Sequence, residues 1–142
     1  MKYAILVIAL IFVLCVFSSG CVKIQEEKVY HVGVLSWISS LTSITDGFIS
    51  KMTELGYIEG KNIVYDIENS TVDMNNYRRI VEKFSSDRVD LVLSFPTEAS
   101  IVANSVLNNS GIPLIFNFAN VEHNNIIDSI ASPGGNTTGV RF

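Results

Sequence analysis

The chain has 142 residues, which is enough for one domain or for one domain with a targeting segment. Its formal net charge is −4, from 10 Lys and Arg against 14 Asp and Glu, and no cluster of basic residues offsets this balance. A nucleic-acid partner is therefore not expected. Hydrophobic residues make up 48% of the chain, and the N-terminus accounts for much of that share.

Residues 1–20 have the three parts of an export signal. Lys2 supplies a positive start, Ala4–Phe17 is an apolar run, and small residues follow it. The run is shorter than the roughly 20 residues that a membrane-spanning helix needs. Cys21 comes directly after the small residues, an order that resembles the lipobox of prokaryotic lipoproteins. The resemblance implies a signal peptide over 1–20 and a lipid on Cys21; an uncleaved anchor helix is the alternative.

Cysteine usage limits the chemistry of the rest of the chain. The two cysteines are Cys15, inside the apolar run, and Cys21. A disulfide, a thiol nucleophile or a cysteine-based metal site is therefore excluded beyond this junction. The sequence also lacks an H-E-x-x-H motif, a G-x-S-x-G motif and a P-loop. No catalytic residue, cofactor or metal site is expected, and residues 21–28 are expected to form a polar tether.

The first predicted strand covers residues 29–36, a run rich in β-branched and apolar residues. A helix is predicted from Leu41 to Leu55, where apolar residues recur at helical spacing and Gly56 stands at the expected C-cap. After a turn, residues 63–67 are predicted to form the second strand.

A second helix is predicted to begin after Asp73, a favourable N-cap residue, and to bury the face that carries Tyr77 and Phe84. Residues 89–95 are expected as a third strand. A third helix is expected over residues 99–107, which carry a regular apolar stripe.

Residues 113–118 are the fourth predicted strand, with Pro113 at its first position, where a missing N–H matters least. Isoleucines within residues 126–130 indicate a short helix. Residues 137–142 follow a Pro-Gly-Gly-Asn turn and are expected to begin a fifth strand.

Strands that alternate with helices predict parallel pairing with helices on both faces of the sheet. We therefore expect an α/β fold with a doubly wound, mostly parallel five-stranded sheet. Right-handed crossover connections favour the strand order 2-1-3-4-5.

Ligands of such sheets bind beyond the carboxyl ends of the strands, near the switch between strands 1 and 3. The start of the third helix would offer free backbone amides to an anion, and Thr97 is placed to cap it. Both Thr97 and Trp37 also have a purely structural interpretation, as a helix cap and as a packing residue. The predicted ligand-binding residues are Ser36, Trp37, Ser94, Phe95, Thr97, Glu98 and Asn120.

Four stretches resemble the solute-binding lipoproteins of ABC transporters: "DGFISKMTELGYIEGKNIVYDIENS", "VDLVLSFPTEAS", "IPLIFNFANVEH" and "SIASPGGNTTGV". The resemblance implies a two-lobed, periplasmic-binding-like fold that clamps a small molecule, such as an amino acid. It also implies a permease and an ATPase as partners, and a lipid-anchored location outside the cytoplasm. Thr97 matches a threonine of the family. Glu98 replaces a typical proline, and Asn120 stands in a segment where many members have Asp-Pro, which favours a cationic or neutral ligand.

In the family, the Pro-Gly-Gly-Asn turn leads into the last strand of the first lobe. The resemblance therefore implies that residues 29–142 are an N-terminal lobe, apparently truncated, whose second lobe would be a partner if it were encoded separately. We expect weak binding by this lobe alone and an exposed inner face around Trp37 and Phe95. An extracytoplasmic ligand-sensing domain and an enzyme on a flavodoxin-like sheet are the alternative functions.

Overall fold

The computed structural model describes residues 28–37, 42–70 and 73–142. The predicted signal peptide and Cys21 lie outside these residues, as does the tether apart from Lys28. Within the described ranges, no helix combines the length and the apolar character that crossing a membrane requires.

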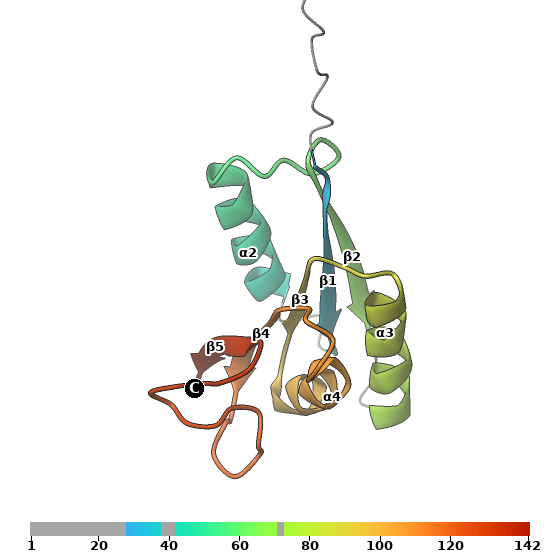
Figure 1. The fold of residues 1–142 in the computed structure, drawn as a ribbon. Coiled ribbons are helices and arrows are strands. Elements are labelled where there is room, and N and C mark those ends of the chain that lie inside the picture. Colours follow the sequence, from blue (N-terminus) through green and yellow to red (C-terminus); the bar gives the residue numbers. More distant parts are fainter. Residues whose placement is uncertain (1–27, 38–41, 71–72) are drawn as a thin grey trace, which may run out of the picture.

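The described chain alternates between strands and helices and forms a five-stranded sheet with the order β2-β1-β3-β4-β5 (Figure 1). Every pair of neighbouring strands is parallel. The predicted fold class and strand order are therefore confirmed. The strands are β1 (Tyr30–Ser36), β2 (Ile63–Asn69), β3 (Leu91–Ser94), β4 (Leu114–Ala119) and β5 (Thr137–Arg141), and the helices are α2 (Thr42–Glu54), α3 (Met74–Ser86) and α4 (Thr97–Leu107).

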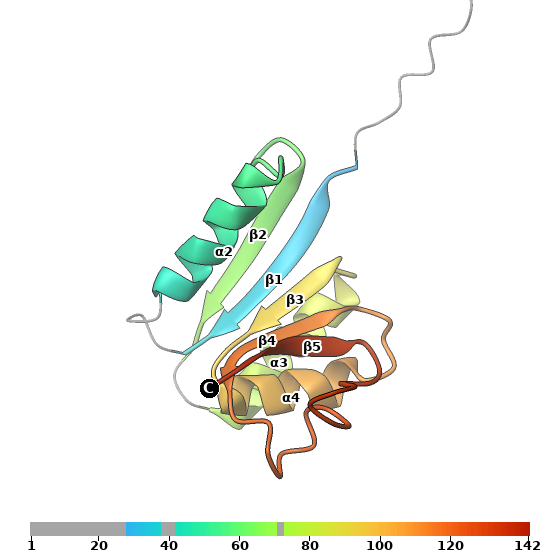
Figure 2. The same cartoon turned by 90° about the vertical axis from the view of Figure 1, so that its left-hand side faces the viewer.

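The helices cover the two faces of the sheet unequally. Helices α3 and α4 pack on one face, where Phe84 and Ala103 meet Leu35 and Val92 of the strands. Helix α2 covers the other face over β1 and β2, while β4 and β5 lie beyond it (Figure 2). Helices on both faces were predicted, and the α2 face is the less covered of the two.

Gly33 is the point where α3 approaches the sheet most closely. A Cβ atom built on Gly33 would lie 2.7 Å from the ring of Phe84. Such an approach leaves no room for a side chain, so glycine at this position of β1 allows the Phe84 ring to pack flat on the strand.

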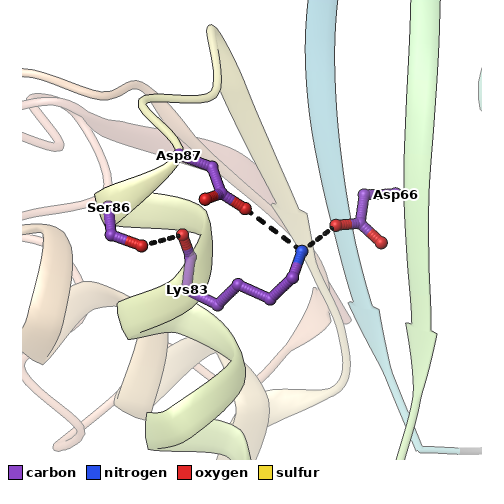
Figure 3. A network of polar contacts seen from close by, with 4 residues as sticks. All are labelled: Asp66, Lys83, Ser86 and Asp87. Atoms are coloured by element: carbon purple, nitrogen blue, oxygen red, sulfur yellow. Dashed lines mark hydrogen bonds and ion pairs between the residues drawn. The ribbon is translucent and has the colours of Figure 1, made fainter.

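Helix α3 begins as predicted, because Asp73 is its N-cap and accepts a hydrogen bond from the backbone N of Asn75 at 2.9 Å. At its other end, Lys83 forms ion pairs with Asp66 of β2 and with Asp87 (Figure 3). These side chains are about half exposed, so the pairs add little stability and mainly orient α3 against β2.

The short helix predicted within residues 126–130 is wrong, since this segment consists of turns and bends. Left-handed backbone at His123 and Asn125, with φ of 63° and 52°, precedes it. The backbone N of Asp128 donates to the carbonyl of Pro133 at 2.8 Å, which closes a turn instead of a helix. Ile126 is nevertheless buried in a cluster with Phe116, Ala119 and Val121. The apolar residues of this segment therefore belong to a loop that packs on the core.

Candidate functional site

The carboxyl ends of the strands meet along one side of the sheet, which we call the carboxyl edge (Figure 2). Helices α2, α3 and α4 begin at this edge, because each follows a parallel strand. The fold brings all seven predicted site residues there: Ser36 and Trp37 at the end of β1, Ser94 and Phe95 at the end of β3, Thr97 and Glu98 in the first turn of α4, and Asn120 after β4.

Thr97 does not cap α4 as predicted. The N-cap residue is Pro96, and no side chain caps it. The hydroxyl of Ser100 reaches back to the Pro96 carbonyl at 2.9 Å. Thr97 is instead the first residue of α4, and its Oγ1 accepts a hydrogen bond from the backbone N of Asn120 at 2.9 Å. Thr97 therefore joins the start of α4, with its free first-turn amides, to the loop after β4.

Asn120 organises the loop after β4 through three hydrogen bonds. Besides donating its backbone N–H to Thr97, it accepts the backbone N–H of Glu122 on its side-chain Oδ1 at 3.0 Å. Its carbonyl accepts a hydrogen bond from Asn124 at 2.9 Å. The side-chain Oδ1 of Asn120 therefore accepts a hydrogen bond within its own loop.

Ser94 and Phe95 lie beneath the carboxyl edge, and each is 0% exposed. The hydroxyl of Ser94 donates to that of Ser100 at 3.0 Å, and the ring of Phe95 packs with Val34 and Leu93 on the α2 face. The predicted exposed inner face around Phe95 is therefore wrong, because the in–out alternation of β3 continues one residue beyond the strand. Ser94 and Phe95 are therefore buried packing residues under the carboxyl edge and are not exposed at it.

Trp37 is partly buried against the core formed by α3 and α4. Its indole Nε1 is buried and has no hydrogen-bond partner among the described residues, and the same holds for the hydroxyl of Tyr77. Burial, with smaller effects of the nearby charges of Glu98 and Asp73, raises the pKa of Tyr77 to about 12. Tyr77 thus stays protonated beside an acidic part of the edge.

A hollow of about 190 Å³ lies between the start of α2 and the ends of β1 and β2. Ser36 pairs with Asn69 across β1 and β2, and its hydroxyl donates to the Asn69 Oδ1 at 2.6 Å. Asp46 adds an exposed carboxylate. The hollow is lined by Ser36, Thr42, Thr45, Asp46, Ile67 and Asn69.

Only Ser36 of this hollow was predicted from the sequence. Thr42, Thr45 and Asp46 have the i, i+3 and i+4 spacing that places side chains on one side of a helix, and this was the available signal. The sequence alone did not place Asp46 at this edge, because a helical pattern does not show where the helix begins relative to the sheet.

The opposite edge of the sheet holds a polar hollow of about 110 Å³ around the Pro-Gly-Gly-Asn turn. Asn136 donates to the carbonyls of Leu107 and Ile112, and Thr137 donates to the Asn104 Oδ1 at 2.8 Å. These bonds attach the turn to the end of α4, so Asn104, Asn136 and Thr137 hold the start of β5 in place.

Within the described part of the chain, no three His, Cys, Asp or Glu side chains are grouped so as to hold a metal ion. The carboxyl edge carries the carboxylates of Asp46, Asp73, Glu98 and Glu122, and Arg141 pairs with Glu122 at 3.3 Å. The carboxyl edge is thus a mostly acidic surface that also carries hydroxyl and amide groups.

Comparison with known proteins finds similar sequences and similar folds. A tyrosine-binding protein from Clostridioides difficile (strain R20291) is 29% identical over 120 residues, which are 82% of this chain and 34% of that protein. The chain thus spans about a third of its curated relative.

Solved structures share the fold. The structure of an "ABC domain" from Streptococcus pneumonia, in complex with L-Trp, has a TM-score of 0.73 and 26% identity, covering 80% of this chain and 39% of that one. A ligand-free, open substrate-binding protein with adhesive properties from Clostridium difficile has a TM-score of 0.73 and 24% identity, covering 78% and 38%. Residues 31–141 match the family described as "ABC transporter substrate binding protein", and the chain therefore belongs to this family.

Proposed function

We propose that residues 29–142 act as the first lobe of an extracytoplasmic solute-binding component of an ABC transporter. Its ligand would be a small molecule such as an amino acid, passed to permease and ATPase subunits. The observation that carries this proposal is the hydrogen bond from the Asn120 backbone N to Thr97 Oγ1, which joins the start of α4 to the loop after β4 at the carboxyl edge. The family binds substrates, and we propose no catalytic step.

The chemistry of the carboxyl edge supports an amino acid as the ligand class. The hollow at the start of α2 offers the hydroxyl of Ser36, the amide of Asn69 and the carboxylate of Asp46, which suit an ammonium group. Relatives named for tyrosine and solved with L-Trp favour an amino acid with an aromatic side chain. Glu98, in the first turn of α4, disfavours a ligand with net negative charge.

The affinity of one lobe should be low. If a complete clamp bound at about 1 μM and each lobe gave half of the binding free energy, one lobe would bind at about 1 mM. A second lobe would also exclude water from the ligand, which an open edge does not do.

Calorimetric titration of the chain with a panel of amino acids tests this function. We expect millimolar affinity for one or a few of them. An affinity in the micromolar range would contradict the half-site, and the absence of any binding at tens of millimolar would contradict the ligand class.

We also propose that residues 1–20 are a lipoprotein signal peptide and that Cys21 carries the lipid that holds the protein on the membrane through the tether 21–28. Lipidation would make Cys21 the mature N-terminus. Replacing Cys21→Ala should move the protein from the membrane fraction to the soluble fraction of cells. Retention of this variant in the membrane would favour the uncleaved anchor helix.

A further inference from the structure

Phe118 has an unusual backbone at the end of β4. Its φ is +52°, in the left-handed region that a bulky residue rarely adopts. The pairing of β4 with β5 shifts register between Asn117 and Ala119, so Phe118 lies in a bulge. Bulges re-aim side chains near binding sites, and strained backbone persists where the surrounding structure enforces it.

Burial of the ring does not explain this conformation. Phe118 is 49% exposed, whereas Phe116, two residues earlier in β4, is 3% exposed. The ring of Phe118 lies 4.8 Å from that of Phe142, at an interplanar angle of 34°, and Phe142 is 68% exposed. The strained residue therefore presents an aromatic pair to the outside of the lobe.

The aromatic pair belongs to the carboxyl edge. Phe118 precedes by two residues Asn120, whose backbone N–H bonds to Thr97, and Phe142 follows β5 at the same edge, where Figure 2 marks the C-terminus. An apolar pair thus stands at the β4–β5 end of the carboxyl edge, close to Asn120 and Thr97, while the hollow at the start of α2 lies on the other side of β3.

We propose that Phe118, supported by Phe142, is a specificity-determining residue that receives the aromatic or apolar side chain of the ligand. This inference rests on the proposed function. Aromatic rings attract one another in offset or tilted geometry beyond the effect of area alone. The half-exposed Phe118 lies two residues before Asn120, which is bonded to Thr97 at the start of α4.

The first test measures the strain without a ligand. Phe118→Gly and Phe118→Ala both remove the ring, but only glycine adopts positive φ without steric cost. The glycine variant should melt about 4 °C higher than the alanine variant. Arg88, with φ of +54° at the opposite edge, is the matched control, and its glycine variant should exceed its alanine variant in the same way.

The second test measures preference by NMR titration of the chain with L-Phe and L-Ala. The wild-type chain should bind L-Phe about 10-fold more tightly than L-Ala, and Phe118→Gly should reduce this ratio to about 2-fold. Phe118→Leu should keep part of it. Arg88→Gly and Leu55→Ala, an exposed apolar residue at the far end of α2, should leave the ratio unchanged.

The results of these two tests distinguish a ligand platform from a protein contact and from a failure of the proposed function. If both amino acids bind with the same ratio in the wild type and in Phe118→Gly, the pair is not a ligand platform, and a contact with further protein or with a second copy replaces it. If no amino acid binds, the proposed function and this inference fall together. If the alanine variant melts as high as the glycine variant, Phe118 is not strained and the inference loses its basis.

Discussion

The Oγ1 of Thr97 lies 2.9 Å from the backbone N of Asn120, although the two residues are 23 positions apart in the chain. This bond fixes the first turn of α4 relative to the loop after β4. The start of α4 and the loop after β4 are therefore held in a fixed relation at the carboxyl edge.

Replacing Thr97→Val should break this link. The Asn120 N–H would lose its acceptor, and the free energy of unfolding should fall by about 1 kcal/mol. Hydrogen exchange of the Asn120 amide should become faster, while Thr97→Ser should keep both values close to wild type. Unchanged exchange at Asn120 in the valine variant would show that the bond is not formed in solution.

Replacing Gly33→Ala should destabilise the fold, because the new methyl group would meet the Phe84 ring at 2.7 Å. Overpacking of this kind costs about 1–3 kcal/mol. Gly47→Ala is the matched control, since Gly47 lies in α2 with nothing within 4 Å of a built Cβ, and it should stabilise the helix by up to about 1 kcal/mol. Urea denaturation that showed both variants equally stable would contradict the packing of α3 on β1.

Replacing Tyr77→Phe should leave the stability unchanged or raise it by up to about 1 kcal/mol. The Tyr77 hydroxyl is buried without a partner among the described residues, so its removal relieves a desolvation penalty and breaks no hydrogen bond. Thermal denaturation measures the effect. A loss above about 1 kcal/mol would mean that the hydroxyl has a partner in solution, such as a buried water.

Asp90 should make stability depend on acid pH. Burial raises the pKa of its carboxyl, but hydrogen bonds from the Lys28 ammonium and the His31 backbone N outweigh burial and leave the pKa below its usual 3.8. A carboxyl with a depressed folded pKa stabilises the protein above its unfolded pKa and loses this effect as the pH falls through the folded value.

The stability advantage of the wild type over Asp90→Asn should accordingly be full at pH 7 and should shrink below about pH 3.8. Denaturation midpoints of the two proteins between pH 7 and pH 2 give the comparison. An advantage that stayed constant over this range would show that Asp90 is not held by Lys28 and His31.

The fold was predictable because the strand segments are short runs rich in apolar and β-branched residues. Their alternation with helical patterns then leaves few possible topologies. The N-cap at Asp73 was also predictable, because a short acidic side chain just before a helical apolar pattern is a favoured N-cap residue. Both signals are local in the sequence.

The details of the site were less predictable because they depend on contacts between distant segments. The role of Thr97 is set by Asn120 across the edge, and Phe95 is buried in a cluster with residues of β1, β2 and β3. The left-handed backbone of Phe118 leaves no trace in the sequence, because phenylalanine is an improbable residue for that conformation. The isoleucines of residues 126–130 show the converse, an apolar pattern that matches a helix and packs as a loop.

Amide chemical-shift mapping of the chain, titrated with L-Phe, tests the central claim most directly. We predict a dissociation constant of about 1 mM, with shifts concentrated at the carboxyl edge, around Asp46, Thr97 and Phe118. Micromolar binding, or shifts centred on the opposite edge around Asn104 and Asn136, would contradict the claim that this lobe forms one half of a ligand site.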